Sequence, residues 1–293
     1  MVVMHSFIDM HMHSTASDGK YSPAILLEKI AELGIKTFAL TDHDTVAGVK
    51  DMENLVSSRG DDTMRFIRGI EFSCKTKIGK CHILGYGYDW HNESFISILT
   101  KGAVLRSQKL EQRLDFLKHE YDIVFDEEGI AMMRGMNSVG KPHIGELMVR
   151  MGVASSVGEA IKNYIDNCPT LNTRLPADEV IHAIRAAGGI SVWAHPLGGV
   201  GEIHMSADKF LEQLACLMDT GLQGLECYYS RYDCQEVDYL VNCAKEHGLL
   251  ISGGSDYHGR KKYPDLGTLN ADTIPIEEKQ LTILQVLYGD SVL

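Results

Sequence analysis

Short apolar segments recur along this chain, and clusters of histidine and acidic residues follow them directly. FIDM is followed by HMHSTASD at residues 11–18, and TFAL is followed by DHD at residues 42–44. Apolar runs of about four to eight residues between helical segments are typical of buried strands. Because side chains alternate along a strand, histidines at i and i+2 point to the same side. The pattern therefore predicts parallel strands that deliver polar groups at their carboxyl ends.

Helical spacing separates these runs and predicts a regular order of elements. Helices are expected over 22–34, 45–60, 176–187, 206–221, 231–248 and 275–293, and strands at 64–73 (ending at Glu71), 188–196 (ending at His195), 222–230 and 249–259. Residues 74–89 alternate too strictly for a helix and predict a hairpin whose return strand carries His82. Repeated strand–helix steps with polar strand ends are the pattern of a parallel α/β barrel or sheet.

One region breaks the alternation. Residues 93–170 show helical spacing over many turns, with no strand between the helices. The chain therefore divides into a first barrel segment (1–92), a helical insertion (93–170) and a second barrel segment (171–293).

The charge balance limits the partners of this protein. The 28 basic and 40 acidic residues among 293 give a net charge of −12, which argues against a long nucleic acid as partner. Bound divalent ions would still make a site locally positive, so a small anionic substrate is compatible. No apolar run is long enough for a membrane span, and seven cysteines without a CxxC pair favour a reducing, cytoplasmic location.

Nine histidine and acidic residues fall at the predicted strand ends. They are His11, His13, Asp18, His43, Glu71, His82, His195, Asp256 and His258. One metal ion needs fewer ligands, so this set predicts two or three divalent ions, with Glu71 as the bridging carboxylate. Six imidazoles and three carboxylates suit Mn, Fe or Zn better than Mg.

These motifs, in this order, resemble those of the PHP (polymerase and histidinol phosphatase) superfamily of metal-dependent phosphoesterases. The resemblance rests on HMHSTASDG, LTDHDT, GIEFS, His82, AHP and GSDYH, and runs through residues 1–90 and about 170–270. It implies a distorted, TIM-like (β/α)7 barrel with a trinuclear centre. The insertion resembles that of small stand-alone members, which include nucleotide phosphatases and an exonuclease acting on short 5′-phosphorylated oligonucleotides.

The insertion also contains candidate substrate contacts. KPH at 141–143 is similar to an RPH or RTH element of that subfamily, which implies substrate contacts by Lys141 and His143; the alternative is a solvated helix cap. The following DNCPTLNTRLP departs from the subfamily pattern, which leaves the roles of Asn172 and Arg174 open. Arg231 is a further candidate, and Tyr228 and Tyr229 end the GLEC strand near the expected mouth.

The function predicted from these residues is hydrolysis of a phosphate monoester of a small nucleotide, a nucleoside 5′-monophosphate or 3′,5′-bisphosphate, by a metal-bound hydroxide. His195 or His258 would protonate the leaving group beside Asp256. The alternatives are a 5′–3′ exonuclease on short oligonucleotides and a histidinol-phosphate-type phosphatase. An amide hydrolase is disfavoured because no lysine lies at a strand end to form a bridge. A non-catalytic role is disfavoured because no ligand is missing.

Overall fold

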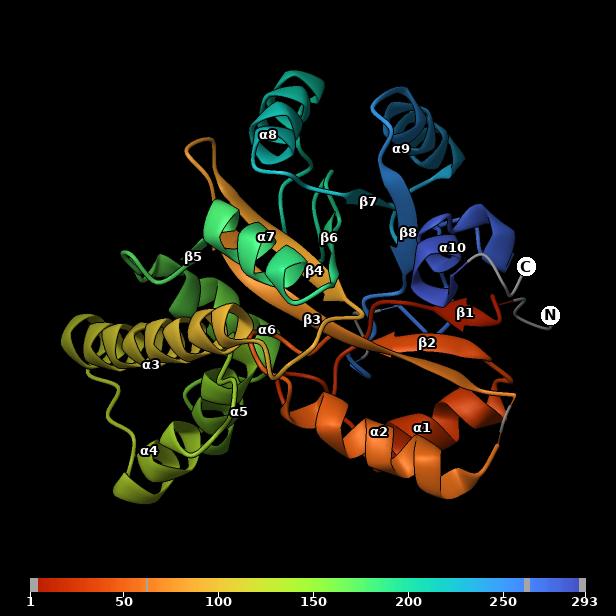
Figure 1. Ribbon diagram of the computed structural model, residues 1–293. Coiled ribbons are helices and arrows are strands. Elements are labelled where there is room, and N and C mark those ends of the chain that lie inside the picture. Colours follow the sequence, from red (N-terminus) through yellow and green to blue (C-terminus); the bar gives the residue numbers. More distant parts are fainter. Residues whose placement is uncertain (1–4, 62, 261–263, 290–293) are drawn as a thin grey trace.

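The computed structural model describes residues 5–61, 63–260 and 264–289 and shows a nearly closed barrel of seven strands (Figure 1). In spatial order these are β1 (Ile8–Asp9), β2 (Thr37–Leu40), β3 (Arg65–Lys75), β4 (Lys80–Tyr86), β6 (Ile190–Trp193), β7 (Gly224–Tyr229) and β8 (Leu250–Gly254). The short strand β5 (Leu175–Pro176) pairs with the end of β3. The predicted barrel fold is confirmed.

Backbone hydrogen bonds between the first and last strands close the barrel. The Met10 amide donates to the Gly253 carbonyl at 3.2 Å, and the Asp256 amide donates to the His11 carbonyl at 2.8 Å. The two segments continue side by side, because the His13 amide donates to Tyr257 at 2.9 Å. Closure of the barrel thus brings together two histidine motifs that lie about 240 residues apart in the sequence.

The hairpin distorts the barrel. β4 runs antiparallel to both β3 and β6, whereas the other neighbouring strands on the barrel path are parallel. β3 does not end at Glu71, as the sequence pattern suggested, but continues to Lys75. It does so because pairing with β4 extends through Ser73 opposite His82. His82 therefore enters the site from a strand that runs opposite to those carrying the other candidates.

Helices that alternate with the strands along the chain pack around the outside of the barrel. They are α1 (Pro23–Glu32), α2 (Ala47–Arg59), α7 (Ala177–Ala186), α8 (Ala207–Asp219), α9 (Cys234–Glu246), the 3-10 turn η2 (Glu278–Gln280) and α10 (Ile283–Tyr288). α1 starts where expected, since the Ser22 hydroxyl accepts from the third helical amide and proline fills the first position. The continuous helix expected over 275–293 is wrong, because the backbone leaves the helical region at Leu281 (φ −94°, ψ 87°), which separates η2 from α10. Residues 290–293 lie outside the described part.

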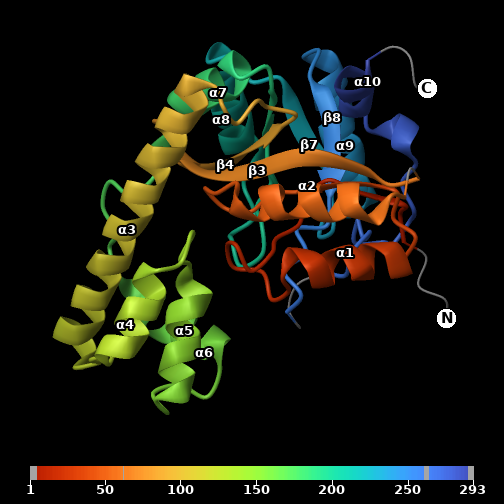
Figure 2. The ribbon, with the colours of Figure 1, turned by 60° about the horizontal axis from the view of Figure 1, so that its bottom comes forward.

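A separate group of helices lies on one side of the barrel (Figures 1 and 2). It comprises α3 (Glu93–Tyr121), α4 (Glu127–Arg134), α5 (Lys141–Arg150), α6 (Val157–Asn163) and the turn η1 (Ile165–Asn167). α3 starts in the barrel core, where Phe95 and Ile98 are buried, and enters a second core from Leu110 onward. One continuous helix therefore joins the insertion to the barrel. No helix within the described ranges is long and apolar enough to cross a membrane.

Candidate metal centre and active site

All nine residues predicted as metal ligands converge at one end of the barrel, and Glu71 lies at their centre. Its Oε2 atom lies 3.0 Å from His43 Nδ1, 3.2 Å from His13 Nε2 and 3.3 Å from His11 Nε2. Its Oε1 atom lies 2.8 Å from His82 Nδ1 and 3.1 Å from His195 Nε2. One carboxylate thus faces donor atoms from five imidazoles, as a bridging ligand would.

The remaining carboxylates form two further points of convergence. Asp256 Oδ1 lies 3.3 Å from His13 Nε2, and Asp18 Oδ1 lies 3.3 Å from His258 Nε2. Three overlapping groups, each with donor atoms within 4.8 Å of one another, result: His13, Asp18, His43 and His258; His11, His13, Glu71 and Asp256; and His43, Glu71 and His82. Overlapping groups of this kind suit a multinuclear centre better than a single ion.

The pattern of unsatisfied atoms tests whether metal ions fit here. His11 Nε2, His13 Nε2, Asp18 Oδ1, His43 Nδ1 and Glu71 Oε2 are buried without a hydrogen-bond partner within the described part. A buried unsatisfied polar atom costs about 1–3 kcal/mol, so five in one place need a common partner. Divalent cations would satisfy all of them, and the imidazole and carboxylate donors suit Mn, Fe or Zn.

The carboxylates of this site are held ionised, as metal ligands must be. Burial opposes ionisation of Glu71, yet the neighbouring His43, His82 and His11 hold its pKa well below the usual range. For Asp18 burial again raises the pKa, but His43 and His258 outweigh it and the net shift is strongly downward. Burial, reinforced by the charges of Arg174 and His195, outweighs the opposing effect of Glu71 and lowers the pKa of His82 to about 4, which leaves a neutral imidazole.

Sequence reasoning missed Glu226, which orients two of the predicted ligands. It is fully buried in β7; its Oε1 atom lies 2.8 Å from His11 Nδ1, and its Oε2 atom accepts from the His195 amide at 2.6 Å. A carboxylate that accepts from Nδ1 fixes the tautomer with a free Nε2 lone pair. The lone acidic residue inside the apolar run LQGLECYYS was the available signal.

Two buried aspartates hold the loops that carry the motifs. Asp42 accepts from the Ser14 amide at 2.8 Å and from the Ser17 hydroxyl at 2.6 Å, which fixes the turn after the two histidines. Asp9 accepts from the Ser255 amide at 2.9 Å and its hydroxyl at 2.6 Å, which fixes the segment before Asp256. Both aspartates occupy strand ends without facing the donor cluster.

The backbone is strained at three positions of the site. Asp44, His195 and Asp256 have φ values of 52°, 30° and 57°, in the left-handed region that residues other than glycine seldom adopt. Each such residue costs about 1–3 kcal/mol and persists where surrounding contacts impose it. The backbone at Gly254 lies so close to His11 that only glycine fits, because a Cβ atom on Gly254 would lie 2.3 Å from His11 Cβ.

A row of cations on α3, also missed from the sequence, starts beside the site. Arg106 donates from Nε to Asp44 Oδ2 at 2.8 Å and from Nη2 to Ser73 Oγ at 2.9 Å. Lys109 and Arg113 continue the row and are buried. Basic residues at i, i+3 and i+7 lie on one helical face, and this spacing was the signal in the sequence.

The predicted substrate contacts are placed in different environments. His143 accepts from the Gly140 amide at 2.9 Å, and Gly140 lies against Asp18, so the start of α5 borders the metal site. The ammonium of Lys141 forms an ion pair with Asp166 on the insertion surface. KPH therefore reaches the rim, but its cation points to an acidic partner in this conformation.

The other candidates are also spread around the mouth. Arg174 Nη1 donates to the Cys74 carbonyl at 3.4 Å, and its charge influences His82. Asn172 and Arg231 are exposed. Of the two tyrosines, Tyr229 donates to Asp256 Oδ2 at 2.9 Å, whereas Tyr228 accepts from Gln280. The hydroxyl of Tyr229 thus holds the predicted ligand Asp256 in position.

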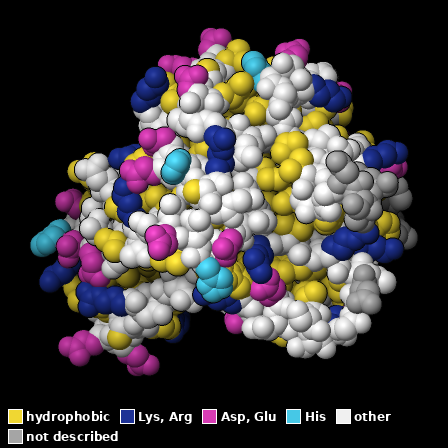
Figure 3. All heavy atoms as spheres, in the orientation of Figure 1, with side chains coloured by type: hydrophobic (Ala, Val, Ile, Leu, Met, Phe, Trp, Pro, Cys, Tyr) yellow, Lys and Arg dark blue, Asp and Glu magenta, His cyan; other side chains and the backbone are white. Residues whose placement is uncertain are grey.

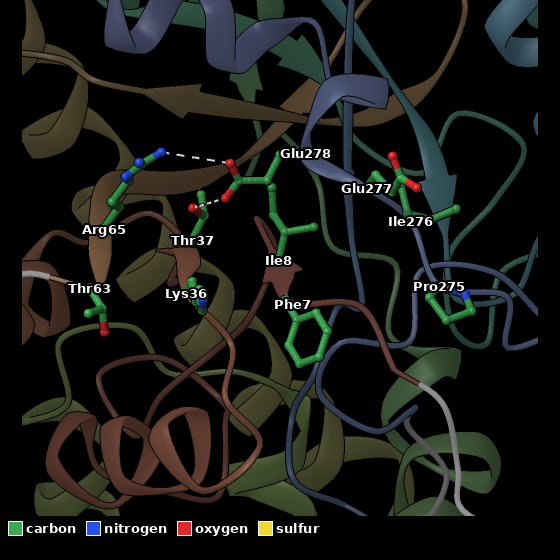
Figure 4. A pocket seen from close by; sticks show the side chains of 10 residues that line it. All are labelled: Phe7, Ile8, Lys36, Thr37, Thr63, Arg65, Pro275, Ile276, Glu277 and Glu278. Carbon is green, nitrogen blue, oxygen red and sulfur yellow. Dashed lines mark hydrogen bonds and ion pairs between the residues drawn. The ribbon is translucent and has the colours of Figure 1, made fainter. Parts of the chain in front are cut away.

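Two cavities at opposite ends of the barrel differ in chemistry. The mouth cavity of about 90 Å³ is lined by seven of the nine predicted ligands and by Glu202. A cavity of about 540 Å³ lies at the starts of the strands, where the Arg65 guanidinium lies 3.7 Å from Glu278 (Figure 4). Among the described residues that line the larger cavity there is no histidine. Catalytic groups in barrels of this kind lie at the carboxyl ends of strands, which favours the mouth.

Comparisons with known proteins agree with this geometry. A model of the PHP domain matches residues 9–166. The chain is 28% identical to a 5′–3′ exoribonuclease of Haemophilus influenzae over 92% of this chain and 98% of the relative. It is 25% identical to a 3′,5′-nucleoside bisphosphate phosphatase of Chromobacterium violaceum over 86% and 87%. The chain is also similar to a solved structure from Bifidobacterium adolescentis, assigned as a metal-dependent phosphoesterase. The alignment spans 91% of this chain and 93% of that chain, with a TM-score of 0.75 and 26% identity.

Proposed function

This chain belongs to the PHP family and is a metal-dependent hydrolase, and from that premise we propose that it hydrolyses phosphate esters of small nucleotides. The observation that carries the proposal is the convergence of nine donor residues around Glu71, with five buried atoms left without partners. We propose all nine as ligands of two or three ions of Mn, Fe or Zn. Bound ions would supply an activated water and a counter-charge for phosphate oxygens.

Hydrogen bonds around this centre determine which ring nitrogens of the histidines carry a proton. Glu226 holds the proton of His11 at Nδ1, and the carbonyl of Asp256 lies 2.8 Å from His258 Nδ1, so both Nε2 lone pairs face the cluster. His195 lies at the mouth with its Nδ1 atom 3.8 Å from Glu202. We assign delivery of a proton to the leaving oxygen to whichever of His195 and His258 is not bound to a metal ion, with Asp256 held in place by Tyr229.

We place the substrate among nucleotides that carry one or two phosphates. A net charge of −12 and the interspersed acidic and basic side chains of Figure 3 support a short substrate over a long polymer. The similarity to a 3′,5′-nucleoside bisphosphate phosphatase supports the same substrate class. The insertion, residues 93–170, is proposed as a lid over the mouth that contributes Lys141 and His143 as substrate contacts. Asn172, Arg174 and Arg231, outside the insertion, are further candidate contacts. Seven free thiols support a cytoplasmic location.

A second candidate is stepwise 5′–3′ exonuclease action on short RNA. The similarity to the Haemophilus influenzae exoribonuclease over nearly the full length of both chains favours it. Both reactions break a phosphate ester at the same centre and differ in whether the leaving group continues as a chain. The length of the substrate therefore separates them.

A panel of substrates tests the proposal. The metal-loaded protein is compared on adenosine 5′-monophosphate, adenosine 3′,5′-bisphosphate, histidinol phosphate and 5′-phosphorylated RNA of two to ten nucleotides, with kcat/KM as the measure. The proposal expects one of the adenosine nucleotides to give the highest value. A value that rises with RNA length would establish the exonuclease instead, and the absence of hydrolysis on every ester would overturn both.

A further inference from the structure

Four cations lie together where α3 meets the barrel, and among the described residues two of them have no hydrogen-bond or ion-pair partner. Lys109 and Arg113 are 9% and 8% exposed. Neither forms a hydrogen bond or an ion pair with any residue that the structure describes, and Arg113 Nε is fully shielded and unsatisfied. Arg106 and Arg174 complete the cluster. Burial of basic groups without partners is costly, either as unpaired charge or through loss of a proton, so this arrangement needs an explanation beyond folding.

The cluster is enclosed between two segments. Arg106, Lys109 and Arg113 lie on one face of α3 and span about 10 Å along the helix axis. The segment 168–174, which returns to the barrel, lies along this helix: Gln112 donates to the Leu171 carbonyl at 3.1 Å and accepts from its amide at 2.9 Å. Arg174, at the end of this segment, adds the fourth cation.

The cluster adjoins the metal centre. Ser73 Oγ accepts from Arg106, and Ser73 follows the central Glu71 by two residues on β3, so both side chains point to the same side of the strand. Arg106 is neutralised by Asp44, which lies next to the predicted ligand His43. The row therefore starts at the metal site with a paired arginine and continues away from it with unpaired cations.

We propose that Lys109 and Arg113, with Arg174, form a subsite between α3 and segment 168–174 that binds a second phosphate group of the substrate. The inference rests on the proposed function, since it assigns the phosphate that is not being hydrolysed. A dianionic phosphate supplies the acceptors that both side chains lack, in charge-assisted hydrogen bonds. A nucleotide with two phosphates, or an oligonucleotide with a 5′-phosphate, carries such a group next to the scissile ester.

The protonation of Lys109 supports this role. Burial, together with the facing cations Arg106, Arg174 and Arg113, lowers the pKa of Lys109 to about 6, and Asp44 is the opposing acidic neighbour. The amine is thus mostly neutral at neutral pH when no anion is present. A bound phosphate would restore its charge, so binding is expected to take up a proton.

Variants of α3 test the subsite on the metal-loaded enzyme. Lys109→Met and Arg113→Met are expected to lower kcat/KM for adenosine 3′,5′-bisphosphate by about 10- to 100-fold, as loss of a charge-assisted hydrogen bond would. Hydrolysis of p-nitrophenyl phosphate, which has one phosphate, should change less than about twofold. Lys101→Met is the matched control, because Lys101 lies on the same helix but pairs with Glu179 in solvent. Equal losses on both substrates, or no loss on the bisphosphate, would overturn the subsite.

A binding measurement separates this inference from the proposed function. The probe is a non-hydrolysable bisphosphonate analogue of adenosine 3′,5′-bisphosphate, titrated by calorimetry at pH 7.5 in buffers of different ionisation enthalpy. The wild type should bind it at least tenfold more tightly than Lys109→Met and take up more protons. If no nucleotide is hydrolysed but this difference persists, the proposed function fails and the subsite stands. If nucleotides are hydrolysed and the difference is absent, the subsite fails alone.

Discussion

The metal centre and the cation row both bury charge, but they arrange it in opposite ways. At the centre, each carboxylate faces imidazoles, and the pKa of Glu71 is held low by histidines. In the row, Lys109 is surrounded by arginines, and its pKa is lowered to about 6. The first arrangement leaves lone pairs for cations, whereas the second leaves N–H groups for an anion. A phosphate ester is the kind of ligand that brings both requirements together.

The largest expected effect comes from removing the carboxylate at the centre of the first region. Glu71→Gln should lower the metal content to at most one equivalent and kcat by at least about 10³-fold, because five imidazoles lose their common anionic partner. Elemental analysis and steady-state kinetics measure both. Glu179→Gln, at an exposed pair, is the control. Retained metal and activity would show that the centre is not organised around this residue.

A smaller loss is expected when the orienting carboxylate is changed. Glu226→Gln keeps the shape of the side chain but weakens the preference for a proton on His11 Nδ1, so metal affinity should fall about 10- to 100-fold. Competition with a chelator measures the affinity, and excess metal should restore much of kcat. Loss of folding by circular dichroism would instead indicate that Glu226 mainly supports the barrel.

The two regions also differ in how far the sequence predicts them. Most of the nine residues are identifiable because strand periodicity is a local rule and a parallel barrel places the carboxyl ends of its strands together, although Glu71 lies inside β3 and His82 near the start of the antiparallel β4. Glu226 escaped because it lies in the middle of a buried strand, and its function depends on a histidine 215 residues away. Lys109 and Arg113 escaped because basic residues on a long helix usually face solvent. The return of segment 168–174 against α3 contributes to their burial.

The C-terminal segment shows a different limit. Helical spacing over 275–293 predicted one helix. Instead, the Ile276 amide donates to Ser6 Oγ at 2.9 Å, which ties the start of this segment to the residues just before β1. Tertiary contacts thus determine the conformation of this segment in place of its local helix propensity. Such contacts between distant residues cannot be predicted from a local sequence pattern.

The pH dependence of stability sharpens the comparison. The folded-state pKa of Lys109, about 6, is below its ordinary value of about 10.5, so between these values the unfolded chain binds more protons and this group makes stability rise with pH. The full difference of one proton corresponds to about 1.4 kcal/mol per pH unit. Lys109→Met should therefore be more stable than the wild type, with the largest gain near pH 6 and a smaller gain at pH 9. Urea unfolding at both pH values measures this, and a pH-independent difference would contradict the burial of an unpaired amine.

The smallest effect is expected at Lys141, which the sequence favoured as a phosphate clamp. Its ammonium pairs with Asp166, and both side chains are about two-fifths exposed. Lys141→Met should thus change the free energy of unfolding by less than about 1 kcal/mol and leave the metal content unchanged. If Lys141 leaves Asp166 to reach substrate, Lys141→Met raises KM by a few-fold, and Asp166→Asn lowers KM because it releases the cation. If neither variant changes KM, the pair belongs to the insertion surface, and substrate recognition rests on the buried row alone.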